Sequence, residues 1–202
     1  MGRVTDVLEI ATPHGPALAH LRPVEGARGG LVLGHGAGGG VNAPDLVAAT
    51  RAAGAVGFSV ALVEQPYRVA GRRSPAPAAQ LDAAWTAVVA ELRTDALAGL
   101  PLVSGGRSSG ARVACRTAGD TGVTGVLCLA FPVHPPGRPD KSRLDELRMP
   151  GVPVLVVQGR SDPFGVPRSR GNVQVVRIAG DHGLKADRAA LERAITSWLT
   201  AF

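Results

Sequence analysis

The chain of 202 residues is long enough for one domain with a substantial hydrophobic core, and short for two. Hydrophobic residues make up 45% of it and charged residues 19%, a globular composition that excludes an intrinsically disordered protein. The net charge of +6 suits nucleic-acid binding, but the cations are almost all arginines scattered along the chain rather than gathered in a patch. We therefore expect a single domain over residues 1–202 that binds no nucleic acid.

Apolar runs in this sequence are too short to cross a membrane, and the first fifteen residues lack the apolar stretch of a signal peptide. We expect a cytoplasmic protein without a membrane partner. Its enrichment in Arg, Ala, Gly and Pro is typical of a GC-rich bacterial genome. Cys115 and Cys128 lie in apolar segments and are predicted to be buried free thiols, and no metal-ligand spacing is present.

Segments with strand and helix patterns alternate along the chain, which favours an α/β protein with a mostly parallel sheet. The strands are predicted at residues 4–10, 17–22, 30–34, 59–63, 102–105, 123–130, 152–158 and 173–178. Helices are predicted at residues 44–53, 78–97, 109–118 and 186–200, with a short helix just before the last strand. Residues 67–77 and 132–149 read as loops, the second with a helical turn near 144–147. This order predicts the α/β-hydrolase fold, a central sheet flanked by helices with no inserted cap domain.

The segment Gly106-Arg107-Ser108-Ser109-Gly110 matches the motif G-x-S-x-G between a predicted strand and a predicted helix. In that motif the serine lies on a sharp, strained turn, and glycines flank it because larger side chains would collide with neighbouring elements. Because the chain is rich in glycine, the motif could occur by chance. The assignment of Ser108 therefore depends mainly on the strand–turn–helix context. Ser108 is the predicted nucleophile, and the alternative is a glycine-rich turn with an incidental serine.

A serine nucleophile needs a base, and the base needs a carboxylate to orient it. His182 follows the last predicted strand and precedes the final helix, where this fold places its catalytic histidine. Asp162 is the only carboxylate in the loop after the strand at 152–158, which gives the order Ser, Asp, His. Asp140 and Asp145 are the reserve candidates for the acid. His182 as a helix-capping residue and Asp162 as a turn residue before Pro163 are the alternative readings.

The glycine-rich turn at residues 34–40 follows the third predicted strand, where an α/β-hydrolase supplies one backbone N–H to its oxyanion hole. We predict that the amides of Ala37 and Ser109 form this hole, with Gly38 as the alternative to Ala37.

The same turn also fits G-x-G-x-x-G, which suggests a Rossmann-type nucleotide binder as a rival interpretation. Glu64 ends the next strand, as a ribose-binding acid would, but it comes thirty residues after Gly34 rather than about twenty. Pro44 also delays the helix that the glycines should open. The rival leaves the order of Ser108, Asp162 and His182 unexplained.

Five motifs together resemble a known group of proteins: LVLGHGAGGG, GGRSSGAR, LAFPVHPPGRPDK, VLVVQGRSDPFG and GDHGLK. The chain resembles small α/β-hydrolases related to dienelactone hydrolase, and among them the group containing testis-expressed protein 30 and a subunit of a nuclear histone-acetyltransferase complex. The resemblance implies the same triad of Ser108, Asp162 and His182. We expect no cofactor and no metal. Relatives often carry Met and a further Gly after the nucleophile, where this chain has Ser109 and Gly110.

We therefore expect a serine hydrolase of the esterase or thioesterase type that acts on a small-molecule acyl substrate through an acyl-enzyme. His35, Arg68, Arg107 and His134 are candidates for the substrate pocket, between loops 67–77 and 132–149. These loops are rich in Arg, Pro and Asp, so we expect short acyl groups to be preferred. The eukaryotic members of the group make a catalytically silent interaction protein the alternative.

Overall fold

A computed structural model describes residues 6–202 of the chain. Its strands are β1 (Val7–Ile10), β2 (Ala17–Arg22), β3 (Gly29–Gly34), β4 (Phe58–Glu64), β5 (Leu102–Arg107), β6 (Gly125–Leu129), β7 (Val154–Gly159) and β8 (Val173–Ile178). Its helices are α1 (Pro44–Ala55), α2 (Pro66–Val69), α3 (Ala78–Thr94), α4 (Ser109–Thr121), α5 (Leu144–Arg148) and α6 (Arg188–Leu199).

The eight strands form one sheet in the order β1-β2-β4-β3-β5-β6-β7-β8. The pairs β1–β2 and β2–β4 are antiparallel, and every pair from β4 to β8 is parallel. Because the carboxyl ends of parallel strands lie at the same edge of a sheet, the loops after β3, β5, β7 and β8 come together there. These loops carry the residues predicted for the site.

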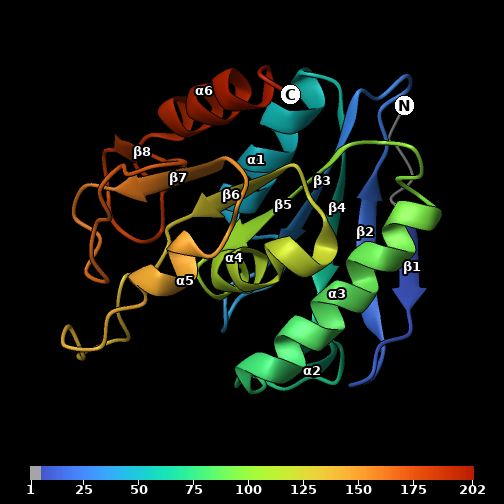
Figure 1. Cartoon of the computed structure of the whole chain (residues 1–202), viewed down its shortest axis with the longest axis horizontal. Coiled ribbons are helices and arrows are strands. Elements are labelled where there is room, and N and C mark those ends of the chain that lie inside the picture. The colour runs from blue at the N-terminus through green and yellow to red at the C-terminus, as the bar shows by residue number, and fades with distance from the viewer. Residues whose placement is uncertain (1–5) are drawn as a thin grey trace.

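Helices cover both faces of the sheet, so the molecule has three layers (Figure 1). Alternate residues of each strand point to opposite faces: Val126 and Cys128 of β6 join the core under α3 and α4, and Leu127 and Leu129 join the core under α1 and α6. Strands β3, β4, β6 and β7 are almost entirely apolar in sequence because both of their faces are buried.

Helix α3 shows how the sequence specifies this packing. Its buried residues recur at helical spacing, so that one face meets the core: Leu81, Ala84, Trp85, Val88, Val89 and Leu92. Each large apolar side chain buried in this way contributes about 1.5–3 kcal/mol relative to exposure. The helix predicted at residues 78–97 is confirmed, and it ends at Thr94.

Several predicted boundaries differ from the structure. The first strand begins at Val7, and the first two residues of the predicted range, Val4 and Thr5, lie outside the described residues. The segment predicted as a loop at 67–77 opens with the one-turn helix α2, which has Pro66 in its first turn. The short helix expected before β8 is absent, since residues 160–172 form turns and irregular structure interrupted by Pro163 and Pro167.

Candidate active site

Ser108 lies between β5 and α4 with φ +52° and ψ −104°, a region that residues other than glycine rarely adopt. The flanking glycines allow β3 to approach this turn closely. A Cβ on Gly106 would lie 2.6 Å from the carbonyl oxygen of Gly34, and one on Gly110 would lie 2.5 Å from the same atom. The G-x-S-x-G segment therefore has the sharp strand-to-helix turn that its sequence predicts.

The structure brings Ser108, His182 and Asp162 together from the ends of three strands. His182 Nδ1 donates to Asp162 Oδ2 at 2.8 Å, and His182 Nε2 lies 3.0 Å from Ser108 Oγ. Because an ionised carboxylate can only accept, Nδ1 carries the proton and Nε2 is free to accept the hydroxyl hydrogen of Ser108. Both distances are within the reach of a general base and the group that orients it.

The carboxylate of Asp162 is fully buried and receives three hydrogen bonds. Besides His182, Gln158 Nε2 donates to Oδ2 at 2.8 Å, and the backbone N–H of Phe164 donates to Oδ1 at 2.8 Å. The ring of Phe164 meets the ring of His182 edge to face, with centroids 4.5 Å apart. Gln158 was missed by sequence reasoning, and its signal was a lone polar side chain near the end of an apolar strand.

The two reserve candidates for the acid form ion pairs with other residues. Asp140 pairs with Arg138 at 3.4 Å, and Asp145 pairs with Arg148 at 3.3 Å, and both carboxylates are exposed. The acid that contacts His182 is therefore Asp162.

The predicted oxyanion-hole residues Ala37 and Ser109 line the same cavity as Ser108, as does Gly38. Within residues 6–202, the amides of Ala37 and Ser109 donate to no other protein group. The hydroxyl of Tyr67 donates to the carbonyl oxygen of Ala37 at 2.8 Å and so fixes this turn. Ser109 is the first residue of α4, where unpaired amides and the helix dipole favour negative charge.

The cavity next to Ser108 has a volume of about 330 Å³ and basic walls. Its charged lining residues are Arg107, Arg112 and Arg143, and no acidic side chain lines it. Arg112 forms a two-point pair with Glu146, with both N···O distances 2.6 Å. Arg143 has no ion pair within residues 6–202. Its burial, and then repulsion from Arg112, lower the pKa of its guanidinium.

Of the four predicted pocket residues, only Arg107 lines this cavity, and the structure does not bring the other three there. His35 is buried, where its Nδ1 donates to the carbonyl of Gly36 at 2.8 Å and its Nε2 accepts from the amide of Gln65 at 3.2 Å. Its burial lowers its pKa, so this imidazole is a neutral structural link. Arg68 and His134 donate to backbone carbonyls near them in the chain, those of Arg72 and Pro135.

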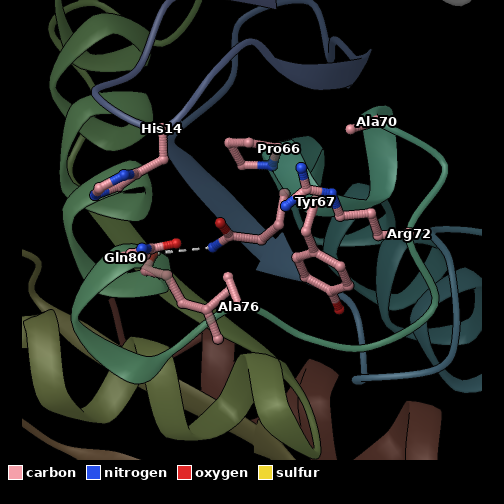
Figure 2. Close-up of a pocket in the computed structure, with 9 residues that line it drawn as sticks. His14, Pro66, Tyr67, Ala70, Arg72, Ala76 and Gln80 are labelled. Carbon is pink, nitrogen blue, oxygen red and sulfur yellow. Dashed lines mark hydrogen bonds between the residues drawn. The ribbon is translucent and has the colours of Figure 1, made fainter.

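A smaller cavity of about 90 Å³ lies between α2 and α3 (Figure 2). Tyr67 and Gln65 line it together with Gln80 and Arg72, and Gln65 Nε2 donates to the carbonyl of Leu81 at 3.2 Å. None of the triad residues lines it. We therefore place the chemistry in the larger cavity.

The structure gives no support to the nucleotide-binding interpretation. Glu64 pairs with His20 at 2.8 Å, and α1 begins at Pro44, well beyond the glycines that would have to open it. Within residues 6–202 no group of three or more His, Cys, Asp or Glu side chains is placed to hold a metal ion. Cys115 and Cys128 are buried free thiols, as predicted.

Comparison with known proteins agrees with this geometry. A family model described as an alpha/beta hydrolase domain matches residues 27–196, and the chain belongs to that family. In the described part of the chain, residues 6–202, no helix has both the length and the apolar character to cross a membrane.

Solved structures show the same fold over nearly the whole chain. An alpha-beta serine hydrolase homologue from Coxiella burnetii has a TM-score of 0.79 at 17% identity, covering 98% of this chain and 99% of that one. A serine hydrolase without a lid from Xanthomonas campestris has a TM-score of 0.78 at 20% identity, covering 98% and 96%. A dienelactone hydrolase from Anabaena variabilis has a TM-score of 0.78 at 16% identity, covering 98% and 97%. The predicted α/β-hydrolase fold is confirmed.

Proposed function

We propose that the protein is a serine hydrolase that cleaves a carboxylic ester, thioester or related acyl bond through an acyl-enzyme intermediate. The observation that carries this proposal is the position of His182, which lies 3.0 Å from Ser108 Oγ and 2.8 Å from Asp162 Oδ2. Family membership and the serine hydrolases among the structural neighbours support the same chemistry.

In the acylation step Ser108 Oγ attacks the substrate carbonyl carbon as its proton passes to His182 Nε2. Asp162 stabilises the imidazolium that forms. The carbonyl oxygen becomes an oxyanion, to which the amides of Ala37 and Ser109 would donate. The tetrahedral intermediate then collapses, and the leaving group departs with the proton from His182.

In the deacylation step water takes the place of the leaving group. His182 accepts a proton from water, the resulting hydroxide adds to the acyl carbon, and the collapse of the second tetrahedral intermediate returns the proton to Ser108 Oγ. No other group has to supply or remove a proton.

The cavity favours short acyl groups and substrates that carry a negative charge. Its volume of about 330 Å³ limits the length of the acyl chain that it can enclose. Arg143 lines the cavity and forms no ion pair within residues 6–202, so its guanidinium would bind a carboxylate on the substrate.

The experiment that tests this proposal is pre-steady-state hydrolysis of p-nitrophenyl acetate. We expect a burst of about one nitrophenolate per protein followed by slower turnover, because the acyl-enzyme forms before it is hydrolysed. A protein that releases no nitrophenolate above the rate of a Ser108→Ala variant would instead support the alternative of a catalytically silent interaction protein.

A further inference from the structure

Arg107, the residue before the nucleophile, has contacts that the reaction described above does not use. Its Nε lies 2.8 Å from Asp45 Oδ2, and its Nη2 donates to the backbone carbonyl of His182 at 3.2 Å. Asp45 is on the first turn of α1, and its side chain is fully buried. One guanidinium therefore joins the end of β5, the start of α1 and the loop that carries the base.

The glycine turn after β3 makes room for this guanidinium. A Cβ on Gly36 would lie 2.8 Å from Arg107 Nη1 and 3.7 Å from the Cβ of Ser108. Gly36 is adjacent to Ala37, whose amide is a predicted oxyanion donor. The guanidinium thus packs against the turn of the oxyanion hole as well as against the loop of His182.

The orientation of Asp45 is set by its own helix. The backbone N–H of Leu46 donates to Asp45 Oδ1 at 3.0 Å, which leaves Oδ2 for Arg107. A buried carboxylate needs a partner because an unpaired charge in the protein interior is strongly unfavourable. Arg107 is therefore held in one position. If its guanidinium moved away from the loop of His182, the buried charge of Asp45 would lose its partner.

We propose that Arg107, anchored by Asp45, is a positioning residue that fixes the backbone of His182 relative to Ser108. This inference rests on the proposed function. Because Arg107 directly precedes Ser108, its backbone is continuous with that of the nucleophile, and its side chain returns to the carbonyl of the base. The link is separate from the His182–Ser108 hydrogen bond, and it limits the drift of the imidazole that would lower the rate of proton transfer.

The test measures kcat and KM on p-nitrophenyl acetate, and the rate of phosphonylation by a fluorophosphonate, for Arg107→Gln, Arg107→Lys and Asp45→Asn. We expect Arg107→Gln to lower kcat and the phosphonylation rate by about 10- to 100-fold, with KM changed less than about threefold. Asp45→Asn should lower kcat by about tenfold, and combining it with Arg107→Gln should add little, because both changes remove the same link.

Arg107→Lys separates positioning from folding. An ammonium group restores the charge opposite Asp45 but, as a single point donor, does not also reach the carbonyl of His182. We expect the melting temperature to return close to that of the wild type and kcat to stay low. This variant also keeps the test decisive if Arg107→Gln does not fold.

The matched control is Asp82→Asn, since Asp82 pairs with Arg116 at 2.6 Å between α3 and α4 and forms no hydrogen bond or ion pair with Arg107, Asp45 or His182. It should lower the melting temperature and leave kcat unchanged. A wild-type kcat in Arg107→Lys or Asp45→Asn would overturn the inference, as would a loss seen only as a higher KM for charged substrates. Wild-type protein that neither labels nor turns over would instead overturn the proposed function.

Discussion

At the residue scale, the triad depends on how the buried Asp162 is held. A carboxylate with no exposed surface keeps its orientation only when donors surround it, and here His182, Gln158 and the amide of Phe164 provide them. Gln158 Nε2 also lies within 3.1 Å of the carbonyl of Phe131 and 2.9 Å of that of Gly165. This amide connects the acid to the loops after β6 and β7.

Replacing Gln158 with Leu should lower both activity and stability. A hydrogen bond to a charged group contributes about 1.5–3 kcal/mol, so its loss should reduce kcat by at least about tenfold and lower the melting temperature. Steady-state kinetics and thermal unfolding of the variant check both effects. Gln174→Leu is the control, because Gln174 is an exposed residue of the edge strand β8, and wild-type kcat in Gln158→Leu would contradict this role.

The residue roles could be predicted to different extents. Ser108, Asp162 and His182 were accessible from sequence because strand order brings the ends of β5, β7 and β8 to one edge of the sheet. Gln158 is only four residues from Asp162, and it was missed although a lone polar side chain in an apolar strand was a signal. Asp45 was not accessible from sequence, because its role depends on meeting Arg107, which belongs to an element far away in the chain. His35 was misjudged for the same reason, since its burial against Gln65 could not be inferred from the turn that contains it.

At the element scale, the short helix α5 is held against α4 by charge. Glu146 pairs with Arg112 at 2.6 Å and with Arg116 at 3.3 Å. Burial alone would raise the pKa of Glu146, but the hydrogen bonds of Arg112 and the charges of Arg112, Arg116 and Arg143 outweigh it, and its pKa is lowered. The helix places Arg143, at its start, beside the cavity.

Glu146→Gln should lower stability in a pH-dependent way. A carboxyl whose folded pKa lies below its unfolded value contributes stability that is present above the unfolded pKa and is lost as pH falls through the folded pKa. We expect the variant to lose about 2 kcal/mol at pH 7, and the difference from wild type to shrink below pH 4.5, the ordinary value for this group. Denaturant unfolding across pH measures this difference in the free energy of unfolding.

The control is Asp145→Asn, which should change stability little because Asp145 is 97% exposed. A stability difference between Glu146→Gln and wild type that does not depend on pH would contradict the prediction.

The loops that line the cavity determine which acyl chain length the protein should prefer. Each buried methylene contributes about 0.8 kcal/mol only where an apolar wall receives it, and this cavity of about 330 Å³ has room for a short chain only. Across acetyl, butyryl, octanoyl and palmitoyl p-nitrophenyl esters, kcat/KM should gain little beyond butyryl. A steady rise to palmitoyl would mean that an apolar channel opens in solution.

Among the elements, those with long periodic patterns could be predicted best. Helices α3 and α4 and the apolar strands follow from spacing alone, because one face or both faces must be buried. The one-turn helix α2 and the irregular segment 160–172 could not be predicted, since contacts with the rest of the molecule determine such short segments. Both border the site, where local patterns are weakest.

At the scale of the whole molecule, the charge of the chain and the charge of the cavity have the same sign. The net charge is +6, and the cavity beside Ser108 has three arginines and no acid in its lining. Such a field attracts anions and weakens as salt screens it.

The field predicts a preference between two esters of similar length, p-nitrophenyl butyrate and mono-p-nitrophenyl glutarate. The second carries a carboxylate, and its kcat/KM should be about fivefold higher at low ionic strength, falling toward that of the butyrate as salt is added. Arg143→Gln should remove most of the preference. Arg138→Gln on the same loop should keep it, because Arg138 pairs with Asp140. Equal rates for the two esters in wild-type protein would contradict the prediction.

The central claim is that Ser108 is a nucleophile activated by His182, and covalent labelling tests it most directly. Wild-type protein treated with a fluorophosphonate should gain one adduct, which peptide mass spectrometry should locate on Ser108. The Ser108→Ala variant should fold, take up no label and lose esterase activity by several orders of magnitude, since only one hydroxyl is removed. An unlabelled wild-type protein, an adduct at another residue, or equal labelling of Ser108→Ala would contradict the claim.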